Sequence, residues 1–270
     1  MKIKVILTSL LALIATVSLS ACSSKGSDSN AQVNKIKEAK VLKVGLQADY
    51  PPFEFQSLQN GKNQIVGSDI DLANAISKKL GVKLEIVNMS FNNVLSSLQA
   101  GKIDLGISGI TATKEREKAF DFSEPYYTAD NYLLVKKSDL NKYQSIDDLK
   151  GKTISAQKGS VQEKIVKEQL KSANLVSLSA VNDEINEVKA GLVQGAVIEN
   201  LIAKSYVAQN PDLAIVDSVK LKTEDASYAV AMSKDSGNLK KEVDEVIKQM
   251  KASGELEKSI DHNYSLSQAK

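Results

Sequence analysis

The chain has 270 residues, and its 35 basic and 33 acidic side chains leave a net charge of +2. That balance excludes the strong basic excess typical of nucleic-acid-binding proteins, so we expect no nucleic-acid partner. One histidine, one cysteine and no tryptophan leave almost no material for a zinc site or a histidine-based catalytic triad, and we expect no metal and no cofactor.

The first 21 residues have the pattern of an export signal. Lys2 and Lys4 precede an apolar run over 5–19, and small residues follow at 20 and 21. The apolar run is shorter than the roughly 20 residues that a membrane-spanning helix needs. A basic start, a short apolar stretch and small residues predict a secretory signal peptide over 1–21, and therefore an exported protein.

Cys22 follows this segment directly and is the only cysteine, so it has no disulfide partner within the chain. The sequence Leu19-Ser20-Ala21-Cys22 resembles the lipobox of bacterial lipoproteins, in which the cysteine is lipidated and becomes the first mature residue. The alternative is an ordinary signal peptide followed by an incidental thiol. Because two or more acyl chains hold a protein stably at a membrane surface, lipidation implies an extracytoplasmic protein anchored to the membrane.

The next residues are small and polar without an apolar period, which predicts a flexible linker over 22–40 and folded structure from Val41. Strand-like apolar runs then alternate with helical periods. The first succession predicts strands at 41–46, 84–87 and 103–108 and helices at 69–80 and 92–100. Ser68 and Gly81 are the expected cap and stop of the helix over 69–80.

A second succession begins near Tyr132. It predicts strands at 153–156, 175–178, 196–198 and 228–232, and helices at 145–149, 161–170, 182–190, 199–209, 238–253 and 255–262. Alternation of strands and helices is typical of sheets that are covered by helices, so the pattern indicates two α/β units.

Candidate binding residues lie where predicted strands end, which is where α/β sheets place their ligand crevices. After the first strand, prolines fix a loop that holds Tyr50 either as a flat wall for a ligand or as a cover of the core edge. Further on, Thr113 can cap a short helix that carries Arg116. A guanidinium fork suits a carboxylate, whereas the alternative is a surface helix whose arginine pairs with a neighbouring glutamate.

The second unit offers two similar positions. Ser160 can cap the helix that follows the strand over 153–156, and a helix N-terminus favours an anion. Glu199 follows the strand over 196–198, where its carboxylate can complement an ammonium group or merely favour the helix dipole. Each of these features is common in α/β proteins when taken alone.

Five blocks of this sequence resemble, in order and spacing, the extracytoplasmic amino-acid-binding proteins of ABC transporters, the bacterial solute-binding protein family 3. They are YPPFEF at 50–55, VGSDIDLANAISKKLG at 66–81, SGITATKERE at 108–117, FDFSEPYY at 120–127 and LKGKTISAQKGS at 149–160. The resemblance implies a type II periplasmic-binding-protein-like α/β fold, with two lobes joined by hinge crossings near 129–131 and 223–227. Lobe 1 would comprise 41–129 plus 228–270, and lobe 2 would comprise 130–227.

The resemblance also implies roles for residues of the first lobe. Tyr50 and Phe91 match the two aromatic walls that enclose the ligand side chain. Gly109 and Thr111 match contacts to the α-amino and α-carboxylate groups, and Arg116 matches the bidentate clamp on the carboxylate. These five residues form the expected half-site of lobe 1.

In the second lobe, Glu199 matches the acidic partner of the ammonium, and Gln157 and Gln162 flank a turn near the ligand side chain. A helix start matches the segment that caps the carboxylate, at Gly159, Ser160 and Val161. One departure concerns Gln47, because family members for cationic amino acids, and the glutamine binders, often carry an acidic residue there. A neutral amide at this position weakens the expectation of a cationic ligand.

The implied function is that of an extracytoplasmic receptor, a monomer, that binds a free polar L-amino acid between closing lobes and delivers it to the membrane permease of an ABC importer. Arginine is favoured slightly over glutamine, because aromatic faces attract a guanidinium and because Asp49 and Glu54 lie close in sequence. No general acid–base pair emerges, so we expect no enzymatic activity. The alternatives are an enzyme on the same scaffold, such as a periplasmic dehydratase, and a sensory or adhesive surface lipoprotein.

Overall fold

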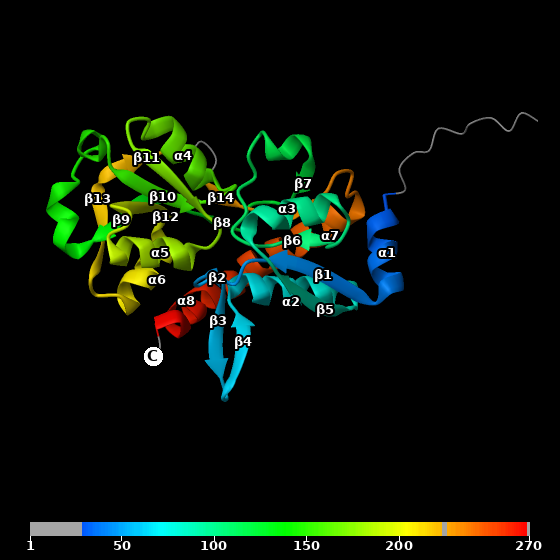
Figure 1. Cartoon of the computed structure of the whole chain (residues 1–270). Helices are drawn as coiled ribbons and strands as arrows, with labels where there is room; N and C mark the ends of the chain where they lie inside the picture. Colours follow the sequence, from blue (N-terminus) through cyan, green and yellow to red (C-terminus); the bar gives the residue numbers. More distant parts are fainter. Residues whose placement is uncertain (1–28, 223–225, 269–270) are drawn as a thin grey trace, which may run out of the picture.

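The computed structural model describes residues 29–222 and 226–268, in which the chain forms two α/β lobes, each built around a five-stranded sheet (Figure 1). The lobe that contains the first strand of the chain is lobe 1, and the other is lobe 2. This arrangement confirms the expected mixed α/β fold with two sheet-containing lobes. The predicted signal peptide, the lipidation site at Cys22 and the linker up to residue 28 lie outside the described residues.

The sheet of lobe 1 is completed by a strand that returns from the other end of the chain. Its strands in spatial order are β5 (Lys83–Asn88), β1 (Val41–Leu46), β6 (Leu105–Gly106), β15 (Ala231–Ser233) and β7 (Phe120–Phe122). The first three are parallel, and β15 is antiparallel to both β6 and β7. The helices packed on this lobe are α2 (Ser68–Leu80), α3 (Phe91–Gln99) and α7 (Asn238–Ser253).

Lobe 2 has a related sheet. Its strands in spatial order are β11 (Asn174–Leu178), β10 (Thr153–Gln157), β12 (Gly195–Glu199), β9 (Asn131–Lys136) and β13 (Leu213–Leu221). β9 is antiparallel to both of its neighbours. The helices of this lobe are α4 (Val161–Gln169), α5 (Val181–Ala190) and α6 (Asn200–Gln209). Short 3-10 helices, η2 (Lys137–Lys142) and η3 (Ile146–Leu149), follow β9.

Two antiparallel segments lie where the chain crosses between the lobes. β8 (Tyr127–Thr128) pairs with β14 (Ser227–Tyr228), and the Ala129 N–H donates to the Ala226 carbonyl at 2.8 Å. Since a single chain passes outward through one segment and back through the other, the lobes are joined by a two-strand hinge. A third sheet, β2 (Asp49–Tyr50), β3 (Glu54–Gln59) and β4 (Lys62–Val66), projects from lobe 1 (Figure 1).

The linker expected over 22–40 is wrong for its last part. Residues 31–39 form α1 (Ala31–Ala39), whose Val33 and Ile36 are buried against the rest of lobe 1. Burial of these two side chains stabilises a helix whose short length and polar composition gave little signal. Folded structure therefore begins before Val41.

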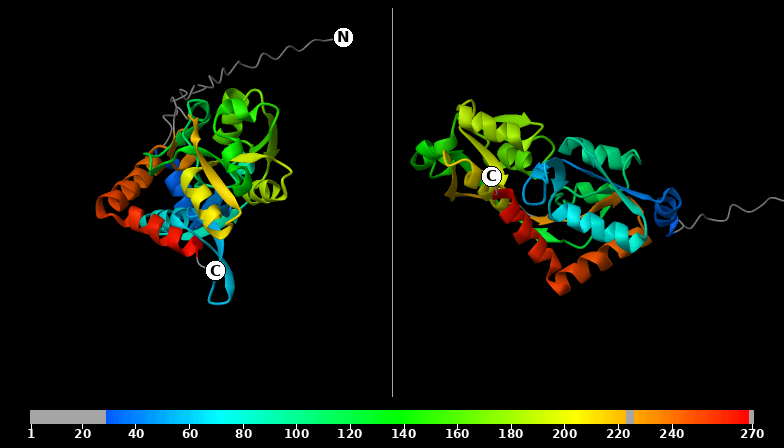
Figure 2. Two further views of the ribbon diagram at one scale, coloured as in Figure 1. Left: turned by 90° about the vertical axis from the view of Figure 1, so that its left-hand side faces the viewer. Right: turned by 90° about the horizontal axis from the view of Figure 1, so that it is seen from below.

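The C-terminal helix α8 (Glu255–Gln268) runs along both lobes, as the view from below shows (Figure 2). Its first half contacts α2, where Ser259 donates to the Asp71 carboxylate at 2.6 Å. Its end contacts α6 of lobe 2, where the Ser267 hydroxyl donates to the Ser205 hydroxyl at 3.4 Å. The assignment of all of 228–270 to lobe 1 thus needs a correction, because the last turn of α8 packs on lobe 2.

Candidate functional site

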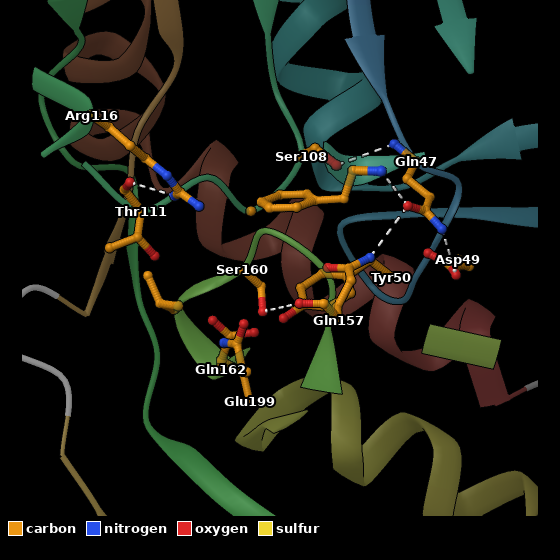
Figure 3. A pocket seen from close by; sticks show the side chains of 13 residues that line it. Gln47, Asp49, Tyr50, Ser108, Thr111, Arg116, Gln157, Ser160, Gln162 and Glu199 are labelled. Carbon is orange, nitrogen blue, oxygen red and sulfur yellow. Dashed lines mark hydrogen bonds between the residues drawn. The ribbon is translucent and has the colours of Figure 1, made fainter. Parts of the chain in front are cut away.

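A pocket lies between the lobes at the carboxyl ends of their strands (Figure 3). The cavity that a water molecule can enter is about 10 Å³, room for about one water, so the lining side chains nearly fill the space between the lobes. The lining residues are Gln47, Asp49, Tyr50, Phe91, Ser108, Gly109, Thr111 and Arg116 from lobe 1, and Gln157, Ser160, Val161, Gln162 and Glu199 from lobe 2. Both lobes are therefore needed to form this site.

Gln47, directly after β1, is held by hydrogen bonds on both ends of its amide. Its Oε1 accepts from the Phe91 N–H and, across the lobes, from Gln157 Nε2 at 3.3 Å. Its Nε2 donates to Asp49 Oδ2 at 3.1 Å and to the Ser179 carbonyl of lobe 2 at 3.0 Å. These bonds fix the amide so that its oxygen faces the residues that line the pocket.

Asp49 lines the pocket and also joins the lobes. Its Oδ2 accepts from the Val181 N–H, at the N-terminus of α5, at 2.8 Å, while Oδ1 meets no donor among the described residues. The Tyr206 hydroxyl of lobe 2 donates to the Asp49 carbonyl at 2.8 Å. Burial raises the pKa of Asp49 to about 6, against the lowering by its hydrogen bonds.

Arg116 is the only arginine among the 35 basic side chains of the sequence, and it lies in this pocket. It begins the 3-10 helix η1 (Arg116–Lys118), whose N-cap is Glu115 and not the predicted Thr113, although the Arg116 N–H donates to Thr113 Oγ1 at 3.2 Å. Its guanidinium donates to two carbonyls, those of Thr111 at 2.8 Å and of Gly159 in lobe 2 at 3.0 Å. It lies 5.7 Å from the centre of the Phe91 ring.

Within the described part of the chain, no carboxylate forms an ion pair with the Arg116 guanidinium. Burial lowers its pKa to about 10, which still leaves it charged at neutral pH. The expected alternative of a surface arginine paired with a neighbouring glutamate is therefore wrong. A half-buried guanidinium whose only hydrogen-bond partners among the described residues are carbonyls favours an anionic ligand.

Glu199 faces the pocket from lobe 2, as the last residue of β12 and opposite Asn131 of β9. The side chain is 3 % exposed, and its Oε2 meets no donor in residues 29–222 and 226–268. Burial raises its pKa to about 8, against a lowering by the neighbouring Tyr228 hydroxyl, which forms no hydrogen bond of normal geometry in the described residues. A buried carboxyl group with a free oxygen is suited to accept a hydrogen bond from a cation.

The start of α4 supplies the rest of the lobe 2 wall. The Ser160 hydroxyl accepts from the Glu163 N–H at 3.2 Å and donates to the Gln157 carbonyl at 2.7 Å, so it is the predicted N-cap. Gln162 Nε2 donates to Asn131 Oδ1 at 2.8 Å. Val161 lines the pocket between these two polar residues.

The structure brings together eleven of the twelve expected binding residues, Gln162 among them. The exception is Gly159, which is outside the lining set: its N–H donates to Glu163 Oε2 at 3.0 Å, and its carbonyl accepts from Arg116. Two lining residues were not among the expected binding residues, namely Asp49 and Ser108. Their place beside Tyr50 and Gly109 was the available signal, because loops at strand ends line such sites together.

Residues 29–222 and 226–268 contain no group of three or more His, Cys, Asp or Glu side chains that could hold a metal ion. Among the helices of these residues, none is long and apolar enough to cross a bilayer.

The chain belongs to the bacterial extracellular solute-binding proteins, family 3, whose family model matches residues 42–265. It is 38 % identical over 251 residues to the arginine-binding extracellular protein ArtP of Bacillus subtilis (strain 168), covering 92 % of this chain and 93 % of that protein.

Solved structures of amino-acid-binding proteins are also similar to this chain. The amino acid ABC transporter substrate-binding protein AbpA of Streptococcus pneumoniae, bound to L-arginine, superposes with a TM-score of 0.86 and is 51 % identical, covering 88 % of this chain and all of that one. The ancestral amino-acid-binding protein AncCDT-1, a precursor of cyclohexadienyl dehydratase, has a TM-score of 0.79 and is 33 % identical, covering 87 % of this chain and all of that one. The two lobes are those of a type II periplasmic binding protein.

Proposed function

We propose that this protein is the extracytoplasmic receptor of an ABC importer and that it binds a free polar L-amino acid, with L-arginine preferred. The observation that carries this proposal is the pair of unmatched groups on opposite lobes. Arg116 of lobe 1 has no carboxylate partner, and Glu199 of lobe 2 has an oxygen without a donor. An α-carboxylate and an α-ammonium group would satisfy both at once.

The rest of the pocket supports arginine over glutamine. Tyr50 and Phe91 offer aromatic faces, which attract a guanidinium. Asp49 Oδ1 lacks a donor among the described residues, whereas Gln47 Oε1 already accepts from the Phe91 N–H and from Gln157. A guanidinium has five N–H donors for such acceptors, whereas a glutamine amide has two. ArtP of Bacillus subtilis is named as an arginine-binding protein and the AbpA structure holds L-arginine, which agrees with this choice.

The proposal extends to the export and the partners of the protein. We propose that residues 1–21 are a signal peptide, that Cys22 carries the lipid anchor, and that the receptor works as a monomer. Its partner in the membrane would be the permease, which receives the ligand from the closed form. Lobe closure around the ligand follows from the division of the site, because each lobe supplies contacts that the other cannot.

An enzyme on this scaffold is the second candidate, since AncCDT-1 is a precursor of a dehydratase. The family itself consists of solute-binding proteins, and the fold alone does not decide the function. Arg116 and Glu199 complement the charges of an unreacted amino acid, which favours binding over catalysis. A sensory or adhesive role would use the same binding event and would need a partner protein.

The test is a thermal-unfolding screen of the mature protein against the twenty amino acids and citrulline. A ligand present at about 1,000 times its Kd stabilises the folded state by about 4 kcal/mol, which raises the unfolding temperature. We expect the largest rise with L-arginine and a much smaller one with citrulline, because citrulline is shaped like arginine but lacks the charge. No rise with any amino acid would refute the proposal.

The Arg116→Ala variant tests the carboxylate clamp. Removing one partner of a buried charged pair costs about 2–5 kcal/mol, so Kd should rise roughly 30- to 4,000-fold. Lys118→Ala is the matched control, because Lys118 is an exposed cation of the same 3-10 helix that does not line the pocket. Equal binding by the two variants would contradict the assignment of Arg116.

A further inference from the structure

Two carboxyl groups lie completely buried beneath the lobe 1 wall of the pocket. Glu54, at the start of β3, and Asp69, in the first turn of α2, are both 0 % exposed. The two carboxyl groups lie close enough for each to influence the pKa of the other. Within residues 29–222 and 226–268, neither forms an ion pair with a cation.

Hydrogen-bond donors reach one oxygen of each carboxyl group. Glu54 Oε1 accepts from the Ser108 hydroxyl at 2.6 Å. Asp69 Oδ2 accepts from the Gly109 N–H at 3.2 Å and from the Tyr126 hydroxyl at 2.9 Å. The remaining oxygens, Oε2 and Oδ1, meet no donor among the described residues. Two ionised carboxylates cannot bond to each other, so one proton between these oxygens is the arrangement that satisfies both groups.

The side chains around the two carboxyl groups favour the protonated form of the pair. Asp49 of β2 faces Glu54, and so does Tyr228 of β14. Tyr126, which precedes β8, faces both carboxyl groups. None of these side chains carries a positive charge, so none of them offsets two buried negative charges.

The donor count assigns the proton to one side. Asp69 has two donors and lies at the N-terminus of α2, where a negative charge is favoured. Glu54 has one donor and no helix dipole to stabilise its charge. In agreement, burial raises the pKa of Glu54 well above its usual range, while it raises that of Asp69 only to about 6.

We propose that Glu54 and Asp69 share one proton at neutral pH, held by Glu54, and that the pair positions Ser108 and Gly109 for ligand binding. Ser108 and Gly109 line the pocket, and Ser108 Oγ in turn accepts from the Gln47 N–H at 3.2 Å. Glu54 and Asp69 do not line the pocket. Through these hydrogen bonds they hold Ser108, Gly109 and Gln47, which do. The inference rests on the proposed amino acid binding, and its first test below does not use a ligand.

The first test follows the Gly109 amide by NMR in the ligand-free, wild-type protein. Because its N–H donates to Asp69, its proton chemical shift reports whether Asp69 is ionised. We expect one titration step near pH 6 and a constant shift from there to about pH 8, with the step absent in Asp69→Asn. A shift that does not move between about pH 4.5 and 8, or a second step at neutral pH, would overturn the shared proton.

The second test compares the affinity of two amide variants for L-arginine by calorimetry. Glu54→Gln keeps an N–H donor toward Asp69, so its Kd should stay within about threefold of the wild type. Asp69→Asn replaces a charged acceptor by a neutral one, which should raise Kd about tenfold. Asp71→Asn is the matched control, because Asp71 lies in the same helical turn, does not line the pocket, and its carboxylate accepts only from Ser259 and Asn263 of α8 in the described structure.

The two variants and the wild type test separate parts of the proposal. An equal loss of affinity in Glu54→Gln and Asp69→Asn would refute the assignment of the proton to Glu54. An unchanged Kd in Asp69→Asn would refute the positioning role. A wild-type protein that binds no amino acid would refute the proposed function instead, and the Gly109 titration would still decide whether the proton is shared.

Discussion

Glu199 should release a proton when the ligand binds. Without a ligand, burial raises the pKa of its carboxyl group to about 8, so about nine-tenths of the molecules hold this proton at pH 7. The ammonium group of a bound amino acid beside Glu199 favours the ionised form. Binding at pH 7 should therefore expel about 0.9 proton from the site.

The size of the pH effect follows from the same shift. Below pH 8 the affinity should rise about tenfold for each pH unit, and across two units the gain is about 2.7 kcal/mol. Above about pH 8 the affinity should level off, because Glu199 is then ionised before the ligand arrives. Asp49 and Asp69 have pKa values of about 6 and are about nine-tenths ionised from about pH 7 upward, so the trend is read most cleanly between about pH 7 and 8.

The assay is calorimetric titration with L-arginine at pH 7 in two buffers with different ionisation enthalpies, which yields the number of protons released. The Glu199→Gln variant should bind L-arginine more weakly. Its binding should release no proton, and its affinity should not depend on pH between about pH 7 and 8. Because the folded state also binds more protons than the unfolded state between about pH 4.5 and 8, the ligand-free protein should lose stability as the pH rises through that range. Zero proton release by the wild type, or an unchanged pH dependence in Glu199→Gln, would refute this reasoning.

Two further predictions concern single residues. Arg116→Lys keeps the charge but loses the planar fork, so Kd for L-arginine should rise about tenfold or more by calorimetry; an unchanged Kd would mean that the carboxylate is not held bidentately. Gly67→Ala should lower the free energy of unfolding in urea several-fold more than the control Gly81→Ala. A Cβ at Gly67 would lie 2.0 Å from the Phe53 carbonyl oxygen, whereas a Cβ at Gly81 would meet nothing within 4 Å. Both glycines have positive φ, 138° and 71°, so equal losses would contradict the close approach at Gly67.

Long periodic segments were predictable from the sequence. The helix expected over 69–80 is α2 (Ser68–Leu80), and its amphipathic period explains the agreement. Its cap was wrong: Ser68 lies inside the helix and donates its backbone N–H to the Pro52 carbonyl, while Gly67 takes the cap position. A contact with a preceding loop decides this end of the helix, and periodicity does not report such contacts.

The hairpin of β3 and β4 was missed although the sequence contains its signal. Asn60 and Gly61 both have positive φ, 51° and 75°, as a two-residue hairpin turn requires. An Asn-Gly pair between alternating segments is the strongest local sign of such a turn, and it could have been used. The strand expected over 103–108 is shorter, β6 (Leu105–Gly106), because only these two residues pair with both neighbouring strands.

The site residues were predictable in identity but not in their bonds. Strand ends and the family resemblance indicate Gln47, Arg116 and Gln157 individually. The bond from Gln157 to Gln47 joins residues 110 positions apart, and no local pattern contains it. The Gly159 N–H was likewise not predictable, because it donates to the Glu163 carboxylate, four residues later, and is therefore not free for a ligand.

Closure of the lobes and binding of the ligand are physically inseparable in this site. The contacts that join the lobes directly, such as Gln157 to Gln47 and Val181 to Asp49, favour closure with or without a ligand. Closure also leaves the Arg116 guanidinium without a carboxylate and the protonated Glu199 carboxyl group with an oxygen that meets no donor among the described residues, which opposes closure. An amino acid removes this opposing cost at both ends, so the ligand shifts the equilibrium by interactions that exist only in the closed state. The unmatched polar groups thus weaken closure of the empty receptor, and the ligand restores it.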